Sequence, residues 1–313
     1  MARLRAAGCV FAEDEARLLI SAARDPGELE VMVSRRAAGL PIEQVLGWAE
    51  FYGLRIAVDP GTFVPRRRTE FLVAQAALLG RGDGVGPGGT VLARGDDPPE
   101  PPAHGGVVHP PVPPGSPGPP GTPPTRPRVV IVDLCCGTGA VGAALAATVD
   151  RAEVHAVDID PDAVRCARRN VPGHVYQGDL YEPLPGRLRG RVDILAANVP
   201  YVPSGEIGLL PAEARAHEPL VALDGGADGL DVLRRVAAGA PAWLARGGYL
   251  LIETSERQAP RAAAAFADSG LSPRVVTSAD LSATVVIGRL ASSARSPSEP
   301  GSPLSPEGTL HIR

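Results

Sequence analysis

Three short segments carry residue types that suit a nucleoside ligand. The first is Asp133–Gly139, read Asp-Leu-Cys-Cys-Gly-Thr-Gly, whose glycines permit a tight turn and close approach of a ligand to the backbone. The second is Asp158, whose carboxylate can accept hydrogen bonds from both hydroxyls of a ribose. The third is Gly178-Asp179-Leu180. Each alone also fits an ordinary turn after a strand, but the three together favour a nucleoside.

Other nucleotide motifs are excluded by spacing. The first segment is not a Gly-x-Gly-x-x-Gly pyrophosphate loop, which disfavours NAD, and the chain has no Gly-Lys-Ser or Gly-Lys-Thr of a P-loop. Asp158 could instead cap a helix, although Asp160 suits that role better because it directly precedes Pro161.

The run Asn198-Val199-Pro200-Tyr201 has the residue types needed to hold a planar –NH2 group. Pro200 keeps Val199 extended and shapes the turn, so the Asn198 carboxamide oxygen and the Val199 carbonyl can point at one position. Tyr201 then offers an aromatic wall for a flat substrate. The simpler alternative is a strand end capped by Asn198.

Residues 129–290 must position these segments. Strands are predicted at 129–134, 154–159, 174–178, 192–197, 249–253, 274–278 and 283–289, and helices at 140–148, 161–170, 230–244 and 257–269. Apolar strands alternating with helices are typical of an α/β fold with a doubly wound, mostly parallel sheet. The last two strands have no helix between them, which predicts one antiparallel strand. Ligands of such sheets bind at the carboxyl ends of the strands, where all four segments lie.

Residues 1–80 read as a separate, mostly helical domain. A β-hairpin is predicted over 51–64 around a turn at Asp59-Pro60-Gly61, and a helix from 69 to 79 with Thr69 as its N-cap.

Two further segments have the composition of disordered chain. Residues 81–128 contain 15 Pro and 11 Gly among 48 residues, which predicts a disordered linker, with a proline-motif ligand as the less favoured alternative. The Ser- and Pro-rich residues 291–313 predict a disordered tail.

Composition narrows the function classes. A formal net charge of −4 and a mean hydropathy of +0.03 argue against a strongly basic nucleic-acid binder. No apolar run reaches the length of a membrane span, and the start of the chain lacks the apolar core of a signal peptide. The four cysteines form no Cys-x-x-Cys pair and the histidines show no metal-ligand spacing. We therefore expect a cytoplasmic protein with reduced thiols, no metal and no membrane partner.

Three motifs carry a resemblance to a known family. Asn198–Tyr201 resembles Asn-Pro-Pro-Tyr, residues 64–70 resemble Pro-Arg-Pro-x-Thr-Glu, and residues 218–230 resemble Glu-Pro…Ala-Leu-x-Gly-Gly-x-Asp-Gly-Leu. The first motif is shared with nucleic-acid amino methyltransferases. The second and third point to the HemK/PrmC family of S-adenosylmethionine-dependent protein (glutamine-N5) methyltransferases, and the resemblance covers nearly all of 1–80 and 129–290.

The resemblance implies a Rossmann-like class I methyltransferase fold with a small helical N-terminal domain that recognises the protein substrate. It implies methyl transfer from S-adenosylmethionine to a glutamine amide in the Gly-Gly-Gln loop of a peptide-chain release factor. The catalytic residues it implies are Asn198, Val199, Pro200 and Tyr201. The cofactor-binding residues it implies are Asp133, Cys135, Cys136, Gly137, Thr138, Gly139, Asp158, Asp179, Leu180 and Asn198.

The chain departs from the family pattern at several positions. Cys135 replaces the first glycine of the cofactor loop, so we expect this position to avoid positive φ. Val199 replaces the first proline of the Asn-Pro-Pro-Tyr motif, whose counterpart here, Asn198–Tyr201, we call the tetrad. Arg67 replaces the second proline of the Pro-Arg-Pro-x-Thr-Glu motif. Two alternatives remain at this point: methylation of an exocyclic amine on a flipped-out nucleic-acid base, and a non-catalytic interaction module that keeps a cofactor-binding fold.

Overall fold

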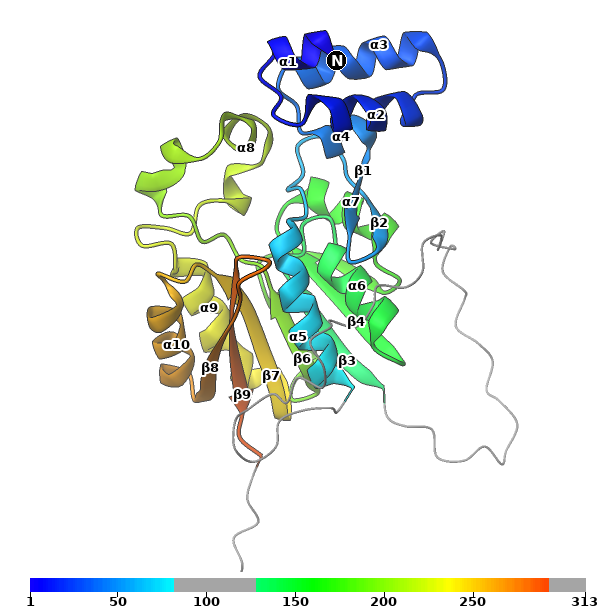
Figure 1. The fold of residues 1–313 in the computed structure, drawn as a ribbon. Helices are drawn as coiled ribbons and strands as arrows, with labels where there is room; N and C mark the ends of the chain where they lie inside the picture. Colours follow the sequence, from blue (N-terminus) through cyan, green and yellow to red (C-terminus); the bar gives the residue numbers. More distant parts are fainter. Residues whose placement is uncertain (82–127, 293–313) are drawn as a thin grey trace, which may run out of the picture.

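The computed structural model describes residues 1–81 and 128–292. Figure 1 shows a group of helices at the N-terminus placed above a larger α/β unit. The predicted linker, apart from residues 81 and 128, and the predicted tail, apart from residues 291 and 292, lie outside the described residues.

A seven-stranded sheet forms the larger unit, in the order β5-β4-β3-β6-β7-β9-β8. Its strands are β3 (Val129–Leu134), β4 (Ala152–Asp158), β5 (His174–Gln177), β6 (Val192–Ala197), β7 (Leu244–Thr254), β8 (Leu271–Ser278) and β9 (Ala283–Leu290). Only β9 runs antiparallel to its neighbours β7 and β8 within this sheet, which confirms the predicted antiparallel strand. The predicted α/β fold class is confirmed.

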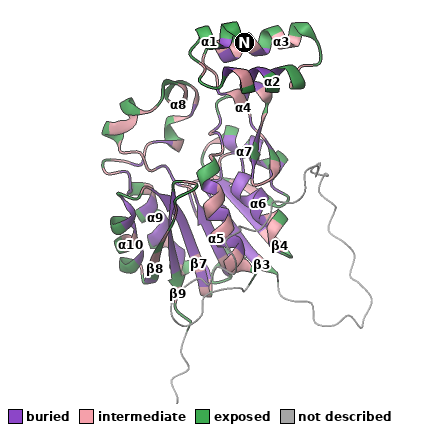
Figure 2. Ribbon diagram, viewed as in Figure 1, coloured by how far each residue is buried: buried purple, intermediate pink, exposed green. Residues whose placement is uncertain are grey.

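Helices cover both faces of the sheet. On one face lie α5 (Glu70–Gly80), α6 (Ala140–Thr148) and α7 (Pro161–Asn170), and on the other lie α9 (Asp231–Gly239) and α10 (Ala259–Asp268). Figure 2 shows the strands between them as buried along most of their length. Because both faces are covered, the central strands are apolar on both sides, as their uninterrupted apolar sequence requires.

The N-terminal helices have an apolar cluster of their own. They are α1 (Ala2–Ala6), α2 (Ala12–Ala22), α3 (Pro26–Ala37) and α4 (Ile42–Leu46), and they pack around Leu4, Leu19 and Met32. The domain boundary at residue 80 stays a prediction. Helix α5, which falls before it, packs on α6 and on strands β6 and β7 of the sheet.

The predicted hairpin is displaced. Its strands are β1 (Trp48–Phe51) and β2 (Leu54–Ala57), joined through Tyr52 and Gly53, so the prediction that the hairpin turns at Asp59-Pro60-Gly61 was wrong. Both turn residues have positive φ, +50° and +73°, the conformation that a two-residue turn needs to match the twist of its strands. The Asp59 segment forms a separate turn closed by Thr62 N donating to the Asp59 carbonyl at 3.2 Å.

Proline sets a boundary that periodicity missed. The helix predicted over 230–244 ends at Gly239 and continues as the short 3₁₀ turn Ala240–Ala242, because Pro241 has no N–H for the helical ladder. Leu244 then begins β7, which is longer than predicted. Thr69 precedes α5 as predicted, but its side chain makes no capping hydrogen bond.

The segment between β6 and α9 contains three short helical elements. These are η3 (Ser204–Leu209), α8 (Ala212–His217) and η4 (Leu220–Ala222). In Figure 1, α8 lies beside the N-terminal helices rather than on the sheet. Contacts between these two regions join the N-terminal part to the larger unit: Arg36 Nη1 donates to Glu213 at 3.2 Å, and Gln44 Nε2 donates to the His217 carbonyl at 3.3 Å.

Candidate active site

A cavity of about 700 Å³ lies at the carboxyl ends of the parallel strands. Its size falls within the range of small-molecule sites, roughly 300–1,000 Å³. Every site residue expected from the sequence lines it except Gly139, which is the N-cap of α6. Phe63, Pro65, Arg66, Arg68 and Thr69, together with residues of the segment around α8, contribute to the rest of the wall. The structure therefore brings the expected cofactor and substrate residues to one cavity, while their individual roles remain predictions.

The loop after β3 contradicts one expectation. Cys135 has a φ of +54°, so the prediction that a non-glycine residue would avoid positive φ there was wrong. The loop is tied to the neighbouring strand, because Cys136 N donates to the Val157 carbonyl at 3.0 Å. This attachment holds Cys135 in a strained conformation that costs about 1–3 kcal/mol. Gly139 also has a positive φ, +78°, and in addition a Cβ there would lie 2.5 Å from Val171.

Two carboxylates lie under this loop, Asp133 buried and Asp158 half-buried. Asp133 is 1% exposed and its Oδ2 accepts from Gly142 N in α6 at 2.8 Å. Burial raises the pKa of Asp133 to about 7, opposed by that hydrogen bond. Asp158 accepts from Gly137 N at 2.8 Å and from Asp160 N at 2.9 Å, and burial also raises its pKa. Asp158 thus links the β3 loop to the end of β4 while it lines the cavity.

The neighbouring acidic residues have separate partners. Asp160 caps α7, as predicted, by accepting from Asp162 N at 2.8 Å. Asp179 Oδ2 accepts from Arg235 Nη2 at 2.6 Å, which ties the loop after β5 to α9. Leu180 has a φ of +50° and is buried. The sequence did not predict the Asp179–Arg235 pair.

The Asn198–Tyr201 run is held from three directions. Asn198 Nδ2 donates to Thr69 Oγ1 at 3.3 Å. The Tyr201 hydroxyl accepts from Arg68, and the Tyr201 carbonyl accepts from Gln258 Nε2 at 3.0 Å. Burial is the main cause that raises the pKa of Tyr201 to about 12, so this hydroxyl stays protonated at neutral pH.

The glycines after residue 224 pack directly against the same run. A Cβ at Gly225 would lie 2.7 Å from the Pro200 carbonyl oxygen, and one at Gly229 would lie 2.3 Å from the Tyr201 carbonyl oxygen. Close backbone packing behind the Asn198–Tyr201 run therefore explains Gly225 and Gly229 of the Gly-Gly-x-Asp-Gly pattern, whereas a Cβ at Gly226 would meet Asp231.

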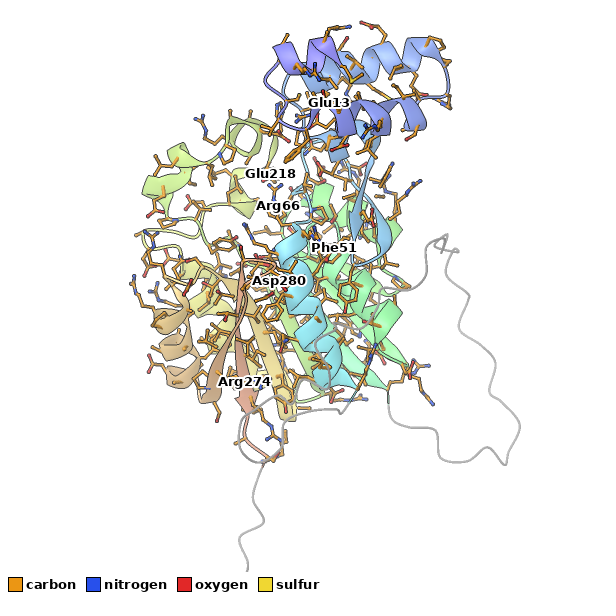
Figure 3. All side chains as sticks on the ribbon, in the orientation of Figure 1. Glu13, Phe51, Arg66, Glu218, Arg274 and Asp280 are labelled. Atoms are coloured by element: carbon orange, nitrogen blue, oxygen red, sulfur yellow. The ribbon has the colours of Figure 1, made fainter. Side chains whose placement is uncertain are left out.

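Several cavity residues were not among the predicted site residues. Arg66 is paired with Glu218, and the same Glu218 oxygen accepts from Val64 N at 3.4 Å. Figure 3 labels Arg66 and Glu218, which lie next to each other between the start of α5 and the α8 segment. Both belong to motifs quoted from the sequence, so the signal was present, but nothing in the sequence paired them. Arg68 and Thr69 were missed in the same way, whereas Gln258, which holds the Tyr201 carbonyl from outside the cavity lining, lies in none of the quoted motifs.

The described residues show neither a metal-binding cluster nor a membrane-spanning helix. Within residues 1–81 and 128–292, no group of three or more His, Cys, Asp or Glu side chains could hold a metal ion. Over the same ranges, no helix combines the length and the hydrophobicity that crossing a bilayer requires.

Comparison with known proteins bears on the resemblance. The methyltransferase small domain family matches residues 123–208. A release factor glutamine methyltransferase from Streptomyces coelicolor is 36% identical over 230 residues, covering 72% of this chain and 67% of the relative. One from Mycolicibacterium smegmatis is 32% identical over 265 residues, covering 82% and 78%. A ribosomal protein uL3 glutamine methyltransferase from Burkholderia pseudomallei is 39% identical over 140 residues, covering 41% and 45%.

The first two relatives match this chain over two thirds or more of their own length. The resemblance drawn from the sequence is thereby confirmed, and the chain belongs to the release factor glutamine methyltransferase family.

Proposed function

We propose that this protein transfers a methyl group from S-adenosylmethionine to the side-chain amide nitrogen of a glutamine in the Gly-Gly-Gln loop of a peptide-chain release factor. The observation that carries the proposal is that Asn198–Tyr201 lines the same cavity as the Cys135–Thr138 loop and Asp158. A methyl donor and a glutamine amide that were both bound in this one cavity would therefore lie next to each other.

The cofactor end of the cavity fits S-adenosylmethionine. Asp158 is a half-buried carboxylate that lines it and retains acceptor capacity beyond its backbone contacts with Gly137 and Asp160. Asp133, the backbone of Cys135–Thr138 and the turn at Asp179–Leu180 complete that wall. We propose that Asp158 holds the ribose, that Asp179 and Leu180 flank the adenine, and that the β3 loop surrounds the methionine end.

S-adenosylmethionine supplies an electrophilic methyl group on a positively charged sulfur. An amide nitrogen is a weak nucleophile, so the residues of this chain must hold it in line with that methyl group, and positioning can supply much of the rate. The Asn198 carboxamide oxygen and the Val199 carbonyl can accept from the two N–H bonds of the glutamine amide. These acceptors also stabilise the positive charge that develops on the nitrogen before its proton leaves.

The extent of the sequence match favours a release factor as the substrate. Two relatives named for release factors match this chain over 72% and 82% of its length; another so named matches over 44%, and the relative named for uL3 matches over 41%. We propose that residues 1–80 recognise the protein substrate and that 129–290 form the methyltransferase domain. The reported relatives are named for protein glutamines, so the nucleic-acid base alternative is not favoured.

Mass spectrometry of a release factor incubated with the protein and isotopically labelled S-adenosylmethionine tests the proposal. We expect one added methyl group on the Gln of Gly-Gly-Gln. A release factor with that Gln replaced by Asn serves as the matched control, because it keeps an amide but places it one carbon closer to the backbone. Labelling of uL3 instead of the release factor would overturn the substrate, and labelling of neither protein would overturn the activity.

Asn198→Ala connects the activity to the site. We expect a loss of roughly 10²-fold or more in the single-turnover rate, as for other preorganised polar groups in active sites. The affinity for S-adenosylmethionine should change much less, because Asn198 chiefly faces the substrate amide. A wild-type rate in this variant would contradict the assignment of Asn198.

A further inference from the structure

Thr69 reaches the tetrad from the N-terminal part of the chain. Its Oγ1 accepts the hydrogen bond from Asn198 Nδ2 across 129 residues of sequence. Thr69 is only 3% exposed, ends the 3₁₀ turn η1 (Arg67–Thr69) and lines the same cavity as Asn198. It lies at the N-cap of α5, yet its side chain caps no helical N–H, so the hydroxyl is available to Asn198.

In this structure the contact engages the Nδ2 end of the Asn198 carboxamide. A carboxamide has a donor end and an acceptor end of nearly equal shape, and its partners determine which end points where. With Nδ2 bound to Thr69, the Asn198 oxygen accepts from no described residue and is not among the buried atoms that lack a partner. That oxygen is therefore left to the cavity, where an –NH2 group requires an acceptor.

We propose that Thr69 is a positioning residue that holds the Asn198 carboxamide with its oxygen toward the methyl-accepting amide. The proposal rests on the function proposed above and adds a residue from outside the tetrad to its machinery. Valine at this position has the same shape as threonine but leaves the Asn198 –NH2 facing a methyl group. The carboxamide would then lose the contact that keeps its acceptor end in place.

The test compares Thr69→Val with Thr69→Ser, which keeps the hydroxyl. We expect Thr69→Val to lower the single-turnover rate about tenfold, the effect of one hydrogen bond, and Thr69→Ser to stay within about threefold of wild type. Affinity for S-adenosylmethionine, measured by calorimetry, should remain within about twofold of wild type for both. Thr69→Ala serves if the valine variant does not fold, with the same expected loss.

A matched control is available at another buried threonine. Thr62 is fully buried, and its hydroxyl donates to the Asp59 carbonyl at 2.7 Å, but it does not line the cavity. Thr62→Val therefore removes a buried hydroxyl bond without touching Asn198. We expect its transfer rate to match wild type, even where its stability falls.

Combination with Asn198→Ala separates positioning from a general structural effect. If Thr69 acts through Asn198, Thr69→Val should cause no further loss of rate in the Asn198→Ala background, and the two stability changes should be non-additive in urea unfolding. Equal loss in both backgrounds with additive stabilities, or a wild-type rate for Thr69→Val, overturns the proposal. The stability coupling needs no methyl transfer, so failure of the proposed function, seen as an inactive wild type, is distinguishable from failure of this inference.

Discussion

Arg68 holds the aromatic side chain of Tyr201 from a distant part of the sequence. The guanidinium carbon lies 5.7 Å from the centroid of the Tyr201 ring, and Arg68 donates to the Tyr201 hydroxyl. Arg68 Nε also donates to Glu253 Oε1 at 2.9 Å, at the end of β7. The start of α5 is thus joined to the ends of both β6 and β7 around the cavity.

Arg68→Met should reduce both stability and rate. The Glu253 side chain is only 2% exposed, so removal of Arg68 leaves a buried carboxylate without that partner, at an expected cost of about 2–4 kcal/mol. Urea unfolding and single-turnover transfer measure the two effects. The double variant Arg68→Met/Glu253→Gln should recover most of the stability but not the rate, because Tyr201 remains unrestrained. Recovery of both would show that Arg68 serves stability alone.

Asp158→Ala should weaken S-adenosylmethionine binding. We expect a loss of roughly 1.5–3 kcal/mol in calorimetry, the effect of removing hydrogen bonds to a charged acceptor. Asp25→Ala is the matched control, because Asp25 also accepts from a backbone N–H, that of Glu28 at 2.8 Å, but caps the remote helix α3. It should lower stability by about 1 kcal/mol and leave the affinity unchanged. A folded Asp158→Ala variant with wild-type affinity refutes the ribose assignment.

Asp133 should make the stability of the ligand-free protein depend on pH. Its folded-state pKa of about 7 exceeds the ordinary value of 3.8, so the folded protein binds more protons than the unfolded chain between these values. The contribution of Asp133 is therefore fully present below pH 3.8 and is lost as pH rises through about 7. Asp133→Asn removes this titration, while its amide oxygen can still accept from Gly142 N.

Unfolding free energies of wild type and Asp133→Asn, measured at several pH values, check this expectation. The advantage of the variant should grow as pH rises from 4 to 7, by up to a few kcal/mol, since each pKa unit corresponds to about 1.4 kcal/mol. Parallel curves for the two proteins would show that the Asp133 carboxyl titrates normally.

Arg36 forms ion pairs with Glu15 and Glu213, and we expect the two pairs to contribute differently to the free energy of unfolding. Arg36 donates to Glu15 through two nitrogens at 2.8 and 2.9 Å, and both side chains are 10% exposed, whereas Glu213 is 40% exposed. Arg36→Met should destabilise the protein by about 3–5 kcal/mol because it leaves Glu15 buried and unpaired. Glu213→Ala should cost less than about 1 kcal/mol. Urea unfolding of the two variants provides the comparison, and equal losses would contradict it.

The sequence alone was sufficient for the elements whose signals are local. Strands β3 and β6 and helices α6 and α7 begin and end where predicted, because apolar runs and the Asp160-Pro161 start are properties of adjacent residues. The gathering of the candidate site at one edge was also predictable, since parallel strands place their carboxyl ends together.

Only the tertiary structure decided the contacts that hold the site in shape. Cys135 takes a positive φ against its own preference because the bond from Cys136 N to the Val157 carbonyl ties the loop to β4. The pairs Thr69–Asn198 and Arg66–Glu218 join residues more than 120 positions apart. Local preference favoured Thr69 as a helix cap, but long-range packing gave its hydroxyl another partner. Such pairings depend on where α5 and the α8 segment dock, and that depends on the whole folded chain rather than on any segment of its sequence.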